Sequence, residues 1–354
     1  MTKLKNILIR RIETEGPISL ADYMAQCLMH PKHGYYQRER VFGADGDFIT
    51  APEVSQMFGE AIGLWLADRW IAMGSPSSVS LVELGPGRGT LMADILRAAS
   101  NVPGFREAAR VHFIETSQQL RALQKQKVPT AKWHDDFSSI PEGPALIVAN
   151  EFFDALPIHQ YEKRDSKWFE RSVGVVGDDL GFVLTQPTAQ FALVPASLLG
   201  APEGSALEVC PAAISISANI AEHLSQHGGA ALYIDYGYAH SAPGDTFQAL
   251  KQHEFTNPFS EPGKADLTAH VAFDRLAESS LGKGTKAFGT NEQGAFLMAI
   301  GLGLRAQKLA TRADDKAQMQ ILSELKRLTA PDEMGTLFKV LAVQHPGLSN
   351  PPGF

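Results

Sequence analysis

The sequence predicts an α/β fold built on a parallel sheet. From Val79 onward, short apolar runs that fit buried strands alternate with longer segments of helical periodicity, as is typical of parallel strands joined by crossover helices. The strand-like runs are SLVEL, VHFIE, ALIVAN, ALYIDYG and, near the end of the chain, TLFKVLAVQH. The helical segments include TLMADILRAA and AAISISANIAEHLSQ. We expect this sheet to form the core that carries the functional site.

Length and composition favour a globular protein with one large domain and additions, or with two domains. The 354 residues are 44% hydrophobic and 20% charged, which is enough to bury a large core. The formal net charge of −7 disfavours a nucleic-acid partner, because phosphate contacts dominate that affinity and require clustered Lys and Arg. A small-molecule or protein substrate fits this composition better.

Cysteine usage and hydropathy predict a cytoplasmic protein. Cys27 and Cys210 are the only cysteines and lack CxxC spacing, so we expect neither a disulfide framework nor a thiolate metal site. No run approaches the roughly 18 apolar residues that span a bilayer, so membrane insertion is not expected. His30 and His33 have the spacing of metal ligands, but their loop has no nearby acids, and we expect no metal.

The pattern divides the chain into a core and three additions. Residues 1–75 are predicted to be helical, and Thr50 with Glu53 in TAPE fits a capping box for a long helix. Short apolar runs separated by helical segments place the core at 76–157, 205–240 and 292–345. Alternation over HQYEK, KWFERSVGVV and GFVLT predicts β-hairpins inserted at 158–204. A stretch rich in Gly, Pro and Ser, residues 241–291, is predicted to form a second insertion near the substrate.

A glycine-rich turn follows the first strand of the core. Gly85, Gly87 and Gly89 lie between a buried strand and the helix TLMADILRAA. Glycines let the chain turn sharply and let a ligand lie against bare backbone at the carboxyl edge of a sheet. A dinucleotide fingerprint would have its third glycine where this chain has Thr90, so the spacing favours S-adenosylmethionine over NAD. A purely structural turn is the alternative explanation of the glycines alone.

Acidic residues at neighbouring strand ends strengthen the cofactor prediction. Glu115 ends the strand VHFIE, where a carboxylate can accept both ribose hydroxyls in bonds of about 1.5–3 kcal/mol each. Glu83, beside the glycine turn, can hold the turn or accept from the methionine ammonium. Asp135 is a candidate acceptor for the adenine amine, and Phe137 is a candidate to pack on the adenine ring. A solvated strand end would explain any one of these acids, but less readily the whole set.

Several motifs together resemble the MidA family of class I methyltransferases, whose relatives include a mitochondrial complex I assembly-factor arginine methyltransferase. They are ELGPGRGTLMADILR, NEFFDALP, IDYGY, DLTAHVAF and GDFITAPEVSQMFGE, and the resemblance runs from about Pro17 to Val343. It implies a seven-stranded, doubly wound, Rossmann-like sheet with S-adenosyl-L-methionine as cofactor. It also implies a protein substrate, with arginine methylation of a complex I subunit as the activity associated with relatives. The N-terminus lacks a convincing presequence, which favours a bacterial, cytoplasmic member.

Under this resemblance, the stretch NEFFDALP carries the catalytic residues. A guanidinium has a pKa above about 12, so it stays protonated at neutral pH and is a poor nucleophile. Carboxylates that hold two of its nitrogens can localise the charge there and direct the third nitrogen toward the methyl group. Glu151 is the first candidate for this grip and Asp154 the second. Phe152 and Phe153 would wall the channel or stack on the guanidinium. The structural alternatives are that Asp154 caps a turn, that the phenylalanines are core, and that Glu151 bonds only to backbone.

Further candidates lie in the N-terminal motif and at other strand ends. The resemblance places Thr50, Pro52, Glu53 and Ser55 in a segment that closes over the cofactor, although capping explains Thr50 and Glu53 without a function. Asn150, the last residue of ALIVAN, is assigned to the same cofactor site. Asp235 and Tyr236 in IDYGY either line the substrate channel or merely terminate their strand.

Two rival classes of function stay open at this point. An NAD-dependent oxidoreductase shares the fold and would bind a nicotinamide dinucleotide, but Thr90 argues against it. A non-catalytic assembly chaperone would retain the cofactor pocket and bind its partner through the hairpins. A homo-oligomer is compatible with the sequence, which does not fix the oligomeric state.

Overall fold

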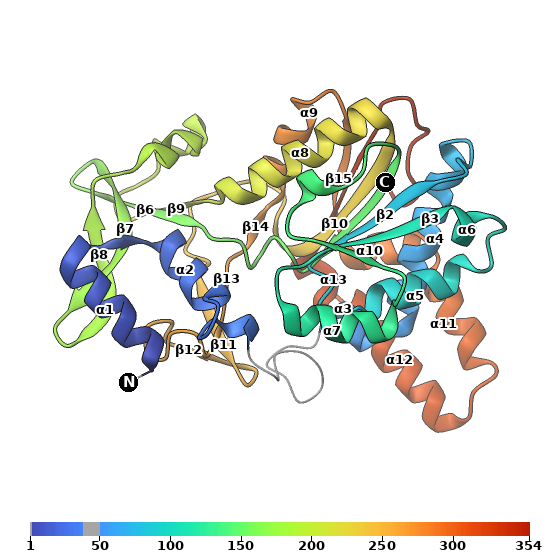
Figure 1. Ribbon diagram of the computed structural model, residues 1–354, viewed down its shortest axis with the longest axis horizontal. Helices are drawn as coiled ribbons and strands as arrows, with labels where there is room; N and C mark the ends of the chain where they lie inside the picture. Colours follow the sequence, from blue (N-terminus) through green and yellow to red (C-terminus); the bar gives the residue numbers. More distant parts are fainter. Residues whose placement is uncertain (1, 38–49) are drawn as a thin grey trace. The chain divides into compact units, whose positions relative to one another are not determined.

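The computed structural model describes residues 2–37 and 50–354, which form two compact units (Figure 1). Unit 1 takes its described residues from Met1–Phe48, Asp154–Ser215 and His240–His270. Unit 2 takes them from Ile49–Phe153, Ile216–Ala239 and Val271–Phe354. The start of the motif GDFITAPEVSQMFGE, residues 46–49, lies outside the described residues.

Unit 2 is built on a sheet with the strand order β15-β16-β10-β5-β2-β3-β4. Its parallel strands are β4 (Lys132–His134), β3 (Ala109–Ile114), β2 (Val79–Leu84), β5 (Ala145–Asn150) and β10 (Gly229–Tyr238). The antiparallel strands are β16 (Phe338–Gln344), which pairs with β10, and β15 (Lys286–Glu292), which pairs with β16. The parallel α/β sheet that the strand pattern predicts is therefore present. Strand β15 and the antiparallel direction of β16, which the pattern does not predict, make it a mixed sheet.

An eighth strand extends the seven-stranded path that the family resemblance implies. The short strand β14 (Val271–Ala272) pairs in parallel with Gly237 and Tyr238 at the end of β10. This pairing is available because β10 is ten residues long, whereas its register with β5 ends at Ile234. The sequence gives no sign of β14, since two residues carry no periodicity.

Helices cover both faces of this sheet, which explains why its central strands are apolar throughout. Every residue of β2 and β5 is buried. One face, with Leu81, Leu146 and Leu232, packs into a single apolar cluster with α4 (Gln56–Ala72), α5 (Thr90–Ala99), α10 (Gln293–Ala299), α11 (Leu302–Ala310) and α12 (Asp315–Thr329). Helices α8 (Pro211–His227) and α9 (Phe273–Leu281) lie on the other side of the sheet (Figure 1). Further helices of this unit are α6 (Phe105–Ala108), α7 (Gln118–Lys127), η2 (Phe137–Ser139) and α13 (Met334–Leu337).

The long helix predicted to start at Thr50 is two helices, and the predicted capping box is wrong. Helix α3 (Ala51–Val54) ends before Ser55, which has an extended backbone. The Ser55 hydroxyl accepts from the Met57 N–H at 3.2 Å and so caps α4. Thr50 precedes α3 without a capping bond from its side chain to any described residue. Glu53 does not reach back to Thr50, because its carboxylate accepts from the Thr90 hydroxyl at 2.5 Å.

Unit 1 is formed mainly by antiparallel hairpins, as the alternating pattern predicts. Its first sheet contains β1 (Ile18–Ser19), β7 (Lys167–Val176), β6 (His159–Arg164), β8 (Asp179–Thr185) and β9 (Ala206–Val209). Strand β9 pairs with β6, although its residues fall in the range predicted for the core. The second sheet contains β12 (Glu254–Thr256), β11 (Gln248–Lys251) and β13 (Asp266–Thr268).

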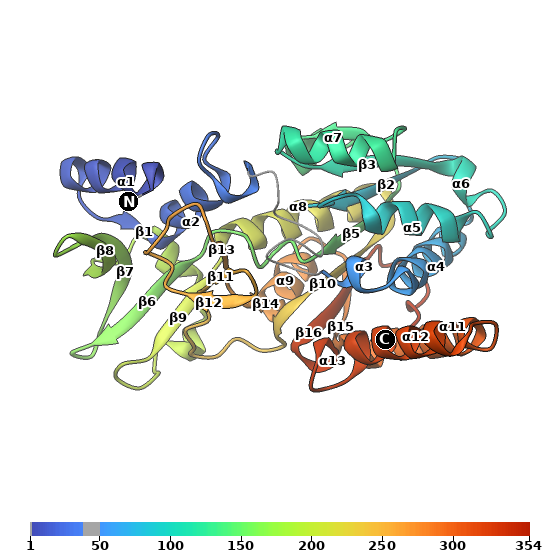
Figure 2. The same ribbon diagram turned by 90° about the horizontal axis from the view of Figure 1, so that it is seen from below.

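The N-terminal helices of unit 1 lie beside its hairpins (Figure 2). Helix α1 (Lys3–Glu15) buries Leu4 and Leu8, and α2 (Leu20–Met29) buries Tyr23, in one apolar cluster with Val173 of β7. The short helices are η1 (Tyr35–Gln37), η3 (Ala189–Leu193) and η4 (Ala196–Leu198). Within residues 2–37 and 50–354, no helix combines the length and the apolar character needed to cross a bilayer.

Candidate active site

The carboxyl ends of the five parallel strands of unit 2 meet at one edge of the sheet. Strand β2 pairs with β3 on one side and with β5 on the other, so the order of the chain reverses at β2. In open α/β sheets, ligands bind outside the carboxyl ends of the strands at such a switch point. The glycine turn follows β2, and Asn150 and Glu151 stand at the end of β5. The fold therefore brings these two predicted segments to one place.

The glycine turn has the backbone conformation that its sequence predicts. Gly85, Gly87 and Gly89 have φ angles of 61°, 50° and 75°, in the left-handed region that favours glycine. A Cβ atom added at Gly85 would lie 2.8 Å from a ring carbon of Phe152, so the turn lies directly against the NEFFDALP segment. The Gly87 carbonyl accepts from the Gln124 amide at 2.8 Å. The turn thus presents fixed, bare backbone beside Phe152.

The Glu83 carboxyl group is buried beside this turn. Its exposed fraction is 3%, and burial raises its pKa to about 8, against a lowering effect of the Met92 backbone N–H. Its Oε2 atom has no hydrogen-bond partner among the described residues. A buried polar atom without a partner costs about 1–3 kcal/mol, so the site favours an N–H donor or a cation there. An ammonium group, such as that of S-adenosylmethionine, has this chemistry.

Glu115 follows β3, and its carboxylate can accept further hydrogen bonds. Its carboxylate accepts from the Ser117 N–H at 2.7 Å and from the Gln124 amide at 3.1 Å. Burial raises its pKa, whereas the bonds from Ser117 and Gln124 lower it. A carboxylate has about four acceptor positions, so these bonds leave room for the pair of ribose hydroxyls.

The two residues predicted to hold the adenine have different surroundings. The Asp135 side chain is 79% exposed and pairs with Arg121 at 2.5 Å. The Phe137 ring is buried and meets the His223 ring edge-on, with the centroids 5.6 Å apart. Packing within unit 2 therefore accounts for Phe137, and its contact with a cofactor stays a prediction.

Glu151 occupies an unusual backbone position at the end of β5. Its φ angle is 51°, in the left-handed region, which costs a residue with a Cβ about 1–3 kcal/mol and persists only where neighbours enforce it. The carboxylate of Asp235 accepts from the next two backbone amides, those of Phe152 at 3.1 Å and Phe153 at 2.9 Å. The turn after β5 is therefore fixed by contacts outside itself.

The Glu151 side chain is also held in place. Its Oε1 atom accepts from the Ala51 N–H at 2.9 Å and from the Asn150 amide at 3.1 Å. The alternative that Glu151 bonds only to backbone is therefore incomplete, since Asn150 contributes a side chain. The Oδ1 atom of Asn150 is buried and has no partner among the described residues. The strand end thus offers a second buried acceptor, beside a carboxylate of fixed orientation.

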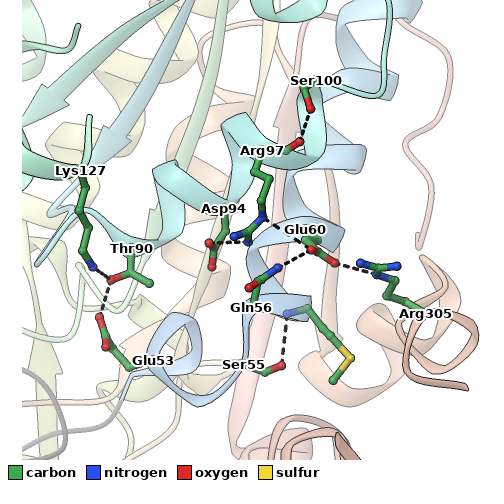
Figure 3. A network of polar contacts seen from close by, with 11 residues as sticks. Glu53, Ser55, Gln56, Glu60, Thr90, Asp94, Arg97, Ser100, Lys127 and Arg305 are labelled. Carbon is green, nitrogen blue, oxygen red and sulfur yellow. Dashed lines mark hydrogen bonds and ion pairs between the residues drawn. The ribbon is translucent and has the colours of Figure 1, made fainter. Parts of the chain in front are cut away.

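Thr90 ties α5 to two other helices (Figure 3). Its hydroxyl donates to Glu53 of α3 at 2.5 Å and accepts from Lys127 of α7 at 2.5 Å. A glycine at this position, as in a dinucleotide fingerprint, would lack both bonds. In the same view, Glu60 of α4 accepts from Gln56 at 2.8 Å and from Arg305 of α11 at 2.7 Å. Helix α3, which begins at Ala51, is thus bonded to α5, the helix that follows the glycine turn.

Other predicted residues have structural partners or belong to unit 1. Pro52 is buried in α3, and Ser55 caps α4. Asp154 is the first residue of its segment of unit 1, and its carbonyl accepts from the Ala269 N–H at 3.0 Å. Within the described part of the chain, no group of three His, Cys, Asp or Glu is arranged to hold a metal ion.

Gln124 connects the two segments that are predicted to bind the cofactor, and the sequence did not predict this role. Its amide donates both to the Gly87 carbonyl and to Glu115, and its Oε1 atom accepts from the Trp133 indole at 2.7 Å. It is fully buried on α7. No local signal marks it, because it stands in the polar run QKQK among residues that are exposed.

The strand order, the glycine turn after β2 and the carboxylate after β3 define the class of S-adenosylmethionine-dependent methyltransferases. Residues 61–291 match the family model described as "Putative S-adenosyl-L-methionine-dependent methyltransferase", and the chain belongs to this family. It is a methyltransferase with S-adenosylmethionine as its cofactor. The alternative of an NAD-dependent oxidoreductase is thereby set aside.

Curated relatives and a solved structure match nearly the whole chain. The chain is 35% identical to "Protein arginine methyltransferase NDUFAF7, mitochondrial" of Xenopus laevis, over 98% of this chain and 86% of the relative. It is 35% identical to the protein of that name from Homo sapiens, over 97% and 83%. A Burkholderia thailandensis protein crystallised with S-adenosyl-homocysteine is 26% identical, with a TM-score of 0.84 over 99% of this chain and 93% of that chain.

The same comparison contradicts the prediction of a cytoplasmic protein. The curated relatives from Xenopus laevis and Homo sapiens are named as mitochondrial proteins. The prediction rested on cysteine usage and on the lack of apolar runs and of a convincing presequence. Cysteine usage and hydropathy do not distinguish the cytosol from a mitochondrial compartment.

Proposed function

We propose that this methyltransferase transfers a methyl group to an arginine side chain of a protein. The observation that carries the proposal is the Glu151 carboxylate, which stands at the switch point of the sheet beside the glycine turn and is held there by Ala51 and Asn150. The curated relatives are named protein arginine methyltransferases. A subunit of respiratory complex I, or a similar protein, is the substrate that the family resemblance favours.

The residues of unit 2 supply what the methyl donor needs. Bound S-adenosylmethionine supplies an electrophilic methyl group on a sulfonium. We assign its ribose hydroxyls to Glu115 and its ammonium to the orphaned acceptor of Glu83. Asp135 is assigned to the adenine amine, with the glycine turn against the remainder of the donor. The buried acceptor of Asn150 belongs to the same site.

Glu151 would orient the guanidinium and draw its positive charge away from the reacting nitrogen, because a protonated guanidinium is a poor nucleophile. A carboxylate that binds two of its nitrogens fixes the plane of the group and directs the third nitrogen to the methyl group; this nitrogen would release one proton to solvent as it is methylated. Orientation of this kind can supply about 7–11 kcal/mol of a barrier. Phe152, which lies against Gly85, would wall the path between donor and substrate. Asp154 is the second candidate for the grip.

The remaining parts of the chain are assigned to the protein substrate and to closure of the donor site. We assign the hairpins at 158–204 and the insertion at 241–291 to substrate recognition. Thr50, Pro52 and Ser55 would cover the donor, since α3 is bonded both to Glu151 and, through Glu53, to Thr90 at the start of α5.

Labelled methyl transfer tests the proposal. The purified protein is incubated with methyl-labelled S-adenosylmethionine and a lysate of cells that lack it. We expect a labelled protein band that Glu151→Gln does not produce. A partner that binds the protein but never acquires label would instead support the non-catalytic chaperone.

Ser55→Ala separates capping from donor contact. Loss of the bond from the Met57 N–H is expected to lower the free energy of unfolding by about 1 kcal/mol, as for other helix caps. If Ser55 also covers the donor, the affinity for S-adenosylhomocysteine falls as well, measured by calorimetry. An unchanged affinity in Ser55→Ala and in Thr50→Val would remove these residues from the donor site.

The raised pKa of Glu83 leads us to expect that the stability of the donor-free protein depends on pH. Its pKa rises from 4.5 to about 8 on folding, so its stabilising contribution is complete below pH 4.5 and is lost as the pH rises through about 8. The loss cannot exceed about 1.4 kcal/mol per pH unit. Urea unfolding of the wild type and Glu83→Gln between pH 5 and pH 9 is expected to show the wild type losing more stability. Parallel curves for the two proteins would contradict this account of Glu83.

A further inference from the structure

We propose that Asp235 is a positioning residue for methyl transfer, because its buried carboxylate holds the turn that orients Glu151. This inference rests on the proposed function, in which Glu151 binds the substrate guanidinium. Asp235 lies on β10, next to β5, and is fully buried. It therefore acts through the backbone of the neighbouring segment and not by contact with the substrate.

Where β5 ends, the Asp235 carboxylate accepts the backbone amides that would otherwise bond to carbonyls of the neighbouring strand. The last ladder bond there runs from the Glu151 N–H to the Ile234 carbonyl at 2.9 Å. The next two amides, of Phe152 and Phe153, both donate to Oδ2 of Asp235, at 3.1 Å and 2.9 Å. The other oxygen of Asp235, Oδ1, accepts from the backbone N–H of the next residue, Tyr236, at 2.9 Å. One carboxylate thus binds three backbone amides and joins the ends of two strands.

This arrangement explains the backbone of Glu151. A left-handed residue followed by two amides that converge on one oxygen forms an anion-binding nest, and here the anion is a side chain of the protein itself. The φ angle of 51° at Glu151 is unfavourable for a residue with a Cβ, so an external contact must hold it. Without the Asp235 carboxylate, the turn would lose the contact that fixes its direction.

The orientation of the turn decides where the Glu151 carboxylate lies. In the structure, that carboxylate reaches the Ala51 N–H at the start of α3 and the amide of Asn150. A change in the direction of the turn would break both contacts and rotate the carboxylate away from its present orientation. The glycine turn has bonds of its own, from Gly89 to Pro86 and from Gln124 to Gly87, so the donor site does not depend on Asp235 in the same way.

The test is a kinetic comparison of Asp235→Asn with the wild type, in the full-length protein and with the substrate found by labelling. Asparagine keeps one oxygen for the Phe152 and Phe153 amides but places an NH2 group against the Tyr236 N–H. We expect kcat to fall at least about tenfold, because small misplacements of a reacting group are costly. The dissociation constant for S-adenosylhomocysteine is expected to change by less than about threefold. A wild-type kcat in Asp235→Asn would overturn the inference.

A double variant shows whether Asp235 acts through Glu151. If it does, Asp235→Asn added to Glu151→Gln is expected to lower the residual activity no further. If the fold-losses of activity in the two single variants multiply in the double variant, the inference is contradicted. The outcomes remain distinct from failure of the proposed function, since full transfer by Glu151→Gln would remove Glu151 from the mechanism whatever Asp235 does.

Gln344→Ala is the matched control for a purely structural effect. Gln344 is fully buried on β16, paired with Ala230 at the opposite end of β10, and bonds Arg69 at 3.2 Å and Ser349 at 3.0 Å. This variant is expected to lose stability but to keep kcat. If Asp235→Asn does not accumulate as folded protein, Asp235→Ser replaces it with the same expected loss of kcat, since its hydroxyl is a smaller acceptor without an NH2 group.

Discussion

Glu151→Gln is expected to lower kcat for methyl transfer by at least about 100-fold, with little change in donor affinity. The amide keeps an oxygen for the Ala51 N–H, so α3 can stay in place, but it carries no charge to hold a guanidinium. Initial rates with labelled donor give kcat, and calorimetry with S-adenosylhomocysteine gives the affinity. The separation of the two measurements is what assigns Glu151 to the substrate and not to the donor.

Glu60→Gln is the matched control for this prediction. Glu60 is another glutamate of unit 2, buried where Glu151 is half-buried, and it is bonded to Gln56 and Arg305 and not to the glycine turn or the end of β5. It is expected to keep wild-type kcat at temperatures well below unfolding. Equal losses of kcat in Glu60→Gln and Glu151→Gln would show that removal of either carboxylate charge disables the enzyme, which would contradict a specific role of Glu151.

Gly85→Ala is expected to weaken binding of S-adenosylhomocysteine by at least about tenfold. The φ angle of 61° costs an alanine about 1 kcal/mol, and its Cβ would lie 2.8 Å from the Phe152 ring. Either the turn or Phe152 must move, and both stand at the site proposed for the donor. Titration calorimetry measures the affinity, and thermal unfolding measures the loss of stability.

Gly74→Ala isolates the cost of backbone strain. Gly74 also has a left-handed backbone, with a φ angle of 83°, but an added Cβ would meet no atom within 4 Å. It is expected to be destabilised like any left-handed glycine while its donor affinity stays at the wild-type value. Wild-type affinity in Gly85→Ala would place the donor elsewhere than the glycine turn.

The core and the glycine turn could be predicted because their signals are local. Strands buried on both faces are apolar at every position, and three glycines at alternate positions mark a turn of left-handed residues. The break at Ser55 could not be predicted in the same way. TAPE has the residues of a capping box, but Glu53 finds a partner in Thr90, 37 positions away, so a tertiary contact displaces the local one.

Contacts between distant segments also decide how the candidate site is held. Asp235 receives the amides of Phe152 and Phe153 from more than 80 positions away, a pairing set by the register of β5 and β10. The sequence placed Asp235 at a strand end but could not tell a channel residue from one that holds a turn. Gln124 was missed because a polar residue on a polar helix gives no sign that it is buried.

The most direct test of arginine methylation is the chemical identity of the methylated product. Protein labelled in the lysate is hydrolysed to amino acids, and the labelled species is identified by mass spectrometry, with Glu151→Gln as the control. The account predicts label on methylarginine that is absent with the variant. Label on another amino acid, or methylarginine formed equally by Glu151→Gln, would contradict it.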